Sequence, residues 1–119
     1  MINKEQKKER FLRDPLPIRL AGLASDLARV ASSSRHESGA ESVTMMLEES
    51  QYFIEWTAAE AEPEVAAELV DIQRMIALWR KTWFEAQHHN LQRILLSVQA
   101  KKWSDQVLGF SDFGGHELG

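Results

Sequence analysis

The chain has 119 residues, a net charge of −4 and no cysteine, which predicts one domain without disulfides, zinc fingers or thiol chemistry. A hydrophobic fraction of 44% and four tryptophans favour a folded protein over a disordered one. The charged N-terminus has no apolar signal segment, and no apolar run approaches the roughly 20 residues that span a bilayer. We therefore expect a soluble, cytoplasmic protein with no membrane partner.

The charges are distributed unevenly along the chain. Residues 36–73 include ten acidic and no basic residues, whereas residues 74–102 include six basic residues and one acidic residue. The acidic middle would repel a nucleic-acid backbone, so we expect no nucleic-acid partner. Instead, acidic faces of one helix are expected to lie beside basic faces of another.

The long segments between the few prolines and glycines are rich in residues that favour helix, and none alternates apolar and polar residues as a strand would. The predicted fold class is all-α, an antiparallel bundle of three helices with a long C-terminal helix. The expected parts are a charged N-terminal arm over 1–14, a single domain over 15–110 with helices at about 15–34, 38–60 and 63–108, and a flexible tail over 111–119.

Local signals predict where these helices begin. Asp14 is a candidate N-cap for the first helix, with Pro15 tolerated in the first turn. Ser38 followed by Glu41 is a capping-box pattern that opens the second helix. Pro63 suits the first position of the third helix, which predicts a tight antiparallel hairpin between the second and third.

The third segment contains no proline or glycine between residues 64 and 108. Its apolar residues follow a heptad-like spacing from Val65 to Trp83, and a seam shifted by one position continues from Leu91 to Val98. At 1.5 Å per residue a continuous helix would be about 68 Å long, roughly twice the length of its partners. Either it breaks near 88–91 to make four helices, or its distal half pairs with another subunit. We predict the second, because "HHNLQ" contains no strong breaker.

The excess of large apolar side chains supports the same prediction. Trp79 and Trp83 lie on the seam, where they would also suit an ordinary core. A pocket between helices for an apolar ligand is a further alternative. We predict a non-catalytic protein that acts through protein–protein interaction or assembly, as a homodimer or with a further protein partner. The predicted interface residues are Trp56, Trp79, Trp83, Leu91, Ile94, Leu95 and Val98.

The segment Glu85-x-x-His88 has the spacing of metal ligands in di-iron carboxylate bundles. At about 100° per residue, however, Glu85, His88 and His89 all project away from the apolar seam. A second Glu-x-x-His is also absent from the chain. We therefore predict no metal site, with these three residues as the only candidates.

An exposed histidine midway along a helix of an acidic bundle is similar in plan to histidine-phosphotransfer domains. In that family a lysine and then a glycine follow the histidine at the third and fourth positions. Here Leu91 and Gln92 follow His88, while Gln92 and Arg93 follow His89, so only Arg93 would neutralise a phosphate. A histidine site is the alternative function. With no catalytic triad or phosphate-binding glycine loop in the sequence, we predict no enzymatic activity and no cofactor.

Overall fold

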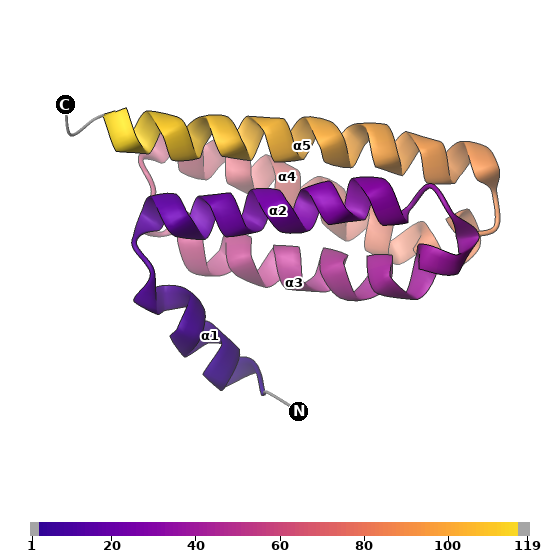
Figure 1. Ribbon diagram of the computed structural model, residues 1–119, viewed down its shortest axis with the longest axis horizontal. Helices are drawn as coiled ribbons and strands as arrows, with labels where there is room; N and C mark the ends of the chain where they lie inside the picture. The colour runs from indigo at the N-terminus through magenta and orange to yellow at the C-terminus, as the bar shows by residue number, and fades with distance from the viewer. Residues whose placement is uncertain (1–2, 117–119) are drawn as a thin grey trace.

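The computed structural model describes residues 3–116, with side chains up to residue 110, and confirms the all-α class. Helices α2 to α5 run along the long axis of the molecule as a bundle, and α1 lies at an angle to them (Figure 1). Over the described range the elements are α1 (Lys4–Arg13), α2 (Leu16–Ser33), the 3-10 turn η1 (Glu37–Gly39), α3 (Ala40–Ala58), α4 (Pro63–Ala86) and α5 (Asn90–His116).

Helices α2 and α3 lie close to their predicted positions, but their N-termini are built differently. Pro15 precedes α2 without a side-chain cap, so Asp14 is not the N-cap. The capping box at Ser38 is wrong because this residue lies inside η1, and Gly39 directly precedes α3 without a side-chain cap. A Cβ added to Gly39 would lie 2.2 Å from the carbonyl oxygen of Ser33. Glycine is therefore required where the chain reverses from α2 into α3.

The predicted continuous helix over 63–108 is wrong. Helix α4 ends at Ala86 and α5 begins at Asn90, so the alternative, a break near 88–91, is close to the observed one. The longest dimension of the molecule is 46 Å, too short for a continuous helix of about 68 Å. The distal half folds back antiparallel to α4 instead of extending away from the domain (Figure 1).

The reversal between α4 and α5 uses neither proline nor glycine. The guanidinium Nη1 of Arg93, one turn into α5, donates a hydrogen bond of 2.7 Å to the carbonyl oxygen of Gln87. The amide of His88 donates to Glu85 and that of His89 to Ala86, which tightens the last turn of α4. Carbonyl groups at a helix end need partners, and here a side chain of the next helix supplies one.

Helix α5 makes its most extensive contact with α2, and small residues allow the two helices to approach closely. The hydroxyl of Ser97 donates to the carbonyl oxygen of Ala31 at 2.6 Å, and that of Ser104 donates to the carbonyl oxygen of Ala24 at 2.8 Å. Ala100 lies between the two serines and is fully buried. A serine hydroxyl is short, so both bonds require the α2 and α5 backbones to be close.

The core fills the space between the four long helices. On α5 the buried face is formed by Leu96, Ala100, Trp103 and Val107, a different face from the predicted seam. The largest buried apolar side chains are Leu20, Leu23, Leu27, Val30, Val43, Leu47, Ile54, Leu69, Ile72, Ile76, Trp83, Leu96, Trp103 and Val107.

Helix α4 packs mainly on α3 and only sparsely on α5. The indole nitrogen of Trp83 donates to the carbonyl oxygen of Ala40 at 3.0 Å, which joins the C-terminal part of α4 to the start of α3. Arg80 pairs with Glu48 of α3 at 3.3 Å, a single contact of the kind that the uneven charge distribution predicts. The sparse α4–α5 contact leaves a groove between these two helices.

Both ends of the described chain are more helical than the sequence predicts. The predicted N-terminal arm contains α1, which Asn3 caps by accepting the amide of Gln6 at 2.9 Å, and Phe11 of this helix is buried. Helix α5 continues to His116, so the predicted tail is helical up to that residue. Residues 117–119 of the predicted tail lie outside the described residues.

Ala100→Leu should destabilise the fold by about 1–3 kcal/mol, because added volume between α2 and α5 forces the helices apart. Urea unfolding followed by circular dichroism measures the change. Ala77→Leu makes the same substitution at an exposed position of α4 and should alter stability by less than about 0.5 kcal/mol. Equal effects of the two substitutions would contradict close packing at Ala100.

Candidate interaction surface on α4 and α5

The outer face of α5 carries the four distal residues of the predicted interface. Leu91 is 68% exposed, and Ile94, Leu95 and Val98 are exposed as well. They lie on the surface because α5 turns a different face toward α2 and the core. The structure therefore brings four large apolar side chains together on one exposed helix face.

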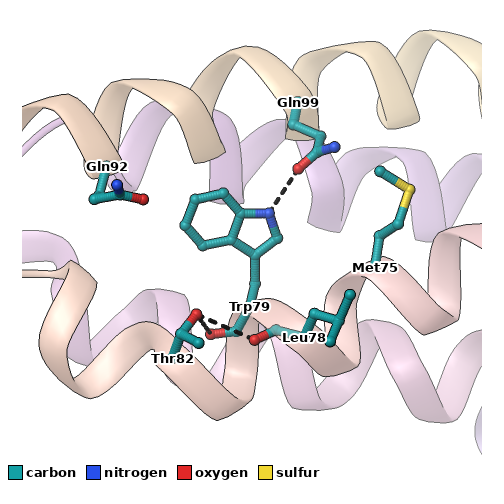
Figure 2. Close-up of a pocket in the computed structure, with 6 residues that line it drawn as sticks. All are labelled: Met75, Leu78, Trp79, Thr82, Gln92 and Gln99. Carbon is teal, nitrogen blue, oxygen red and sulfur yellow. Dashed lines mark hydrogen bonds between the residues drawn. The ribbon is translucent and has the colours of Figure 1, made fainter.

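The groove beside this face contains Trp79, which is half-buried. In Figure 2 its indole stands between α4 and α5, and its nitrogen donates a hydrogen bond of 2.6 Å to the side-chain oxygen of Gln99. The groove has a volume of about 290 Å³. Its lining residues are Met75, Leu78, Trp79, Thr82, Gln92 and Gln99.

Apolar side chains flank the groove on both helices. Leu78 of α4 is 65% exposed, and Met75 lies one turn before Trp79 on the same helix (Figure 2). On α5, Leu95 lies between Gln92 and Gln99 and points to the same side of the helix at about 100° per residue. The exposed apolar surface therefore extends from α5 across the groove to α4.

The other two tryptophans of the predicted interface are buried inside the chain. Trp83 joins α4 to α3 through its bond to the carbonyl oxygen of Ala40. Trp56 lies against Phe11 of α1, with ring centroids 5.8 Å apart. Both contribute to packing within the chain, so of the three predicted tryptophans only Trp79 lies beside the exposed surface.

The candidate metal ligands do not converge. Glu85, His88 and His89 are all exposed, as the helical phase predicted. The Nδ1 atom of His88 lies 3.3 Å from a carboxylate oxygen of Glu37, a residue outside the candidate ligand set. Among the residues that the structure describes, no group of three or more histidine and carboxylate side chains is arranged to hold a metal ion.

The similarity in plan to phosphotransfer domains also fails at the histidines. His88 and His89 lie in the reversal between α4 and α5, not midway along a helix as the sequence analysis assumed. Arg93, the one cation expected to neutralise a phosphate, donates to the carbonyl oxygen of Gln87 instead. The geometry therefore favours an interaction surface over a histidine site.

A buried carboxyl group that the sequence analysis did not identify lies between α2 and α3. Asp26 is 2% exposed, and its Oδ1 atom accepts a hydrogen bond from Arg29. Its Oδ2 atom has no donor among the described residues. The Asp26 carboxyl group interacts with Glu49, which pairs with Lys7 of α1. If Oδ2 carries a proton and donates it in a hydrogen bond to Glu49, the two carboxyl groups form a donor–acceptor pair and do not repel each other.

The two carboxyl groups have opposite pKa shifts. Burial, together with the adjacent Glu49 carboxylate, raises the pKa of Asp26 to about 7. Burial also acts to raise the pKa of Glu49, but hydrogen bonds from Asp26 and Lys7 hold it below its usual value. The shared proton therefore belongs to Asp26, and Glu49 is the ionised partner.

Asp26→Asn should stabilise the protein by about 2–4 kcal/mol at pH 8, because it removes a carboxyl group that has to ionise in a buried site. Between its unfolded pKa of 3.8 and its folded pKa of about 7, the folded wild type holds a proton that the unfolded chain releases. The contribution of Asp26 to wild-type stability therefore falls as the pH rises through this window. Urea unfolding at pH 5 and pH 8 measures the difference.

The matched control is Asp71→Asn, which removes an exposed carboxylate of α4 and should leave the pH dependence of stability unchanged. The Asp26→Asn profile should be flatter than the wild-type profile between pH 4 and pH 7. If the Asp26→Asn and wild-type profiles of stability against pH were parallel, the assignment of the proton to Asp26 would be contradicted.

The comparisons with known proteins identify no relative of this chain. No protein-family model, no curated protein and no solved structure matches it. Across the described residues, no helix is both long and apolar enough to cross a membrane. Function is therefore inferred from the geometry of the surface.

Proposed function

We propose that this is a non-catalytic protein that acts through protein–protein interaction and forms a homodimer through the outer face of α5. The observation that carries the proposal is the grouping of Leu91, Leu95 and Val98, all exposed, on one face of one helix. Contiguous exposed apolar side chains of this kind mark interaction sites, because covering them releases ordered water.

The spacing along this face favours a second copy of the chain as the partner. Leu91, Leu95, Val98 and Lys102 follow a 4-3-4 spacing, which suits pairing of two helices. If two α5 helices pair antiparallel about a point between Leu95 and Val98, each Leu95 lies opposite a Val98. Each Leu91 then lies opposite a Lys102, whose apolar stem covers the leucine while its ammonium stays in water.

Charges at the two ends of the seam fit the same register. Of Leu91, Leu95, Val98 and Lys102 only Lys102 is charged, and it lies opposite Leu91, so no like charges are opposed along the seam. Met75, Leu78 and Trp79 lie beside the seam and enlarge the apolar area that a second copy would cover. These features support self-association over binding of an unrelated helix.

Leu95→Glu should weaken the dimer by about 100-fold, because the two-fold interface buries two new carboxylates against apolar side chains at roughly 1.5 kcal/mol each. Multi-angle light scattering at micromolar concentrations measures the mass, and circular dichroism checks that the helices are retained. Leu108→Glu is the matched control, since this residue is also exposed on α5 but lies outside the seam. A monomeric wild type across this range would overturn the proposal.

Cysteine pairing tests the register directly, since the native chain contains no cysteine. Leu95→Cys chains mixed with Val98→Cys chains should form a mixed disulfide under mild oxidation, because only opposed positions come within the roughly 4.4–6.8 Å between Cα atoms that a disulfide requires. Non-reducing electrophoresis with mass spectrometry measures the products. Each variant alone should cross-link more slowly than the mixture. Equal rates for all three samples would exclude the antiparallel register.

A further inference from the structure

Helix α1 lies on α3 through one row of its side chains. The ammonium group of Lys4 lies 4.3 Å from the ring centroid of Tyr52, and Lys7 pairs with Glu49. One turn further along, the ring of Phe11 stacks on another ring of α3. The contacts recur at positions i, i+3 and i+7 of α1, which is one face of a helix.

The aromatic part of this contact is the most specific. Phe11 is stacked on Phe53, with ring centroids 4.2 Å apart and planes 7° apart, and it also lies against Trp56. The buried guanidinium of Arg19 lies on the same phenylalanine ring at 6.0 Å. Phe11 is the one buried residue of α1, so it anchors the helix while the lysines supply charge.

The surface of α3 beneath α1 has the chemistry of a site for ammonium groups. A pocket of about 340 Å³ there includes carboxylates and aromatic rings together. Carboxylates attract ammonium groups by charge, and aromatic faces attract them through the ring quadrupole. The residues of α3 that supply these carboxylates and rings are Glu48, Glu49, Tyr52 and Trp56.

One observation indicates that α1 does not use the whole site. Met45, one turn before Glu49 on α3, lines the same pocket and is 69% exposed. A longer basic helix would cover Met45 and retain all the contacts that α1 makes.

Helix α1 is also attached loosely. Its contact with α3 is small, and it joins α2 through Asp14 and Pro15 in extended conformation. A ten-residue helix is marginal in water without a surface to lie on. Helix α1 therefore depends both on its contacts with α3 and on the high effective concentration that its covalent link provides.

We propose that this side of α3 is a docking site for a basic helix of a partner protein with the pattern Lys-x-x-Lys-x-x-x-Phe, and that α1 occupies it until displaced. The site consists of Glu49, Tyr52, Phe53 and Trp56. It lies on a different helix from the self-association surface of α5, so the two proposals are tested independently.

The test uses a fluorescein-labelled peptide of residues 3–14 and fluorescence anisotropy on the full chain. A double variant with Lys7→Ala and Phe11→Ala vacates the site, and it should bind the peptide at least about 10-fold more tightly than the wild type, in which α1 competes. Lys7→Glu keeps the buried phenylalanine but opposes Glu49, so it should also bind the peptide more tightly than the wild type. Circular dichroism verifies that both variants are folded.

Glu49→Lys, added to either variant, should abolish the gain in affinity. Glu41→Lys makes the same change at an exposed position of α3 outside the site and should leave the gain intact. A peptide with Phe11→Ala should bind at least about 10-fold more weakly than the native peptide. Equal affinity of the peptide for wild type and variants, or binding that is insensitive to Glu49→Lys, would overturn the proposal.

Discussion

The close approach of α5 to α2 decides the shape of this protein. Ser97 and Ser104 place hydroxyl groups on carbonyl oxygens of α2, and the small side chain of Ala100 lets the two backbones come near each other. Because α5 is held against α2, it cannot also pack fully on α4, and the groove beside Trp79 results. The packing of α5 on α2 also leaves Leu91 and its apolar neighbours on the surface.

Polar groups in the interior serve a different purpose from this packing. The pair formed by Asp26 and Glu49 places a proton-binding carboxyl group between α2 and α3, at a cost in stability that grows as the pH rises from 3.8 to about 7. Glu49 also receives Lys7 from α1, so the carboxyl pair connects the bundle with the helix that covers it. In some proteins, buried polar groups that reduce stability are retained for specificity, and here the carboxyl pair coincides with the docking site proposed on α3.

The two proposed surfaces differ in chemistry in a way that separates their partners. The α5 surface is apolar with few charges, and its spacing fits another α5 in antiparallel orientation. The α3 surface combines Glu49 with aromatic rings and already carries a basic helix of the same chain. Apolar area gives affinity without much selectivity, whereas charge and ring geometry select for the type of helix that binds.

The sequence by itself determined the all-α class, the approximate positions of α2 and α3, and the apolar character of Leu91, Ile94, Leu95 and Val98. It did not decide which face of α5 is buried. That helix carries two apolar stripes, and periodicity alone does not tell which of them faces the core. The tertiary structure chose the face with Ala100, since only small residues permit close contact with α2. The tertiary structure also decided the reversal before α5, where the sequence has no proline or glycine. There the packing of α5 on the bundle places Arg93 where it can donate to the carbonyl oxygen of Gln87.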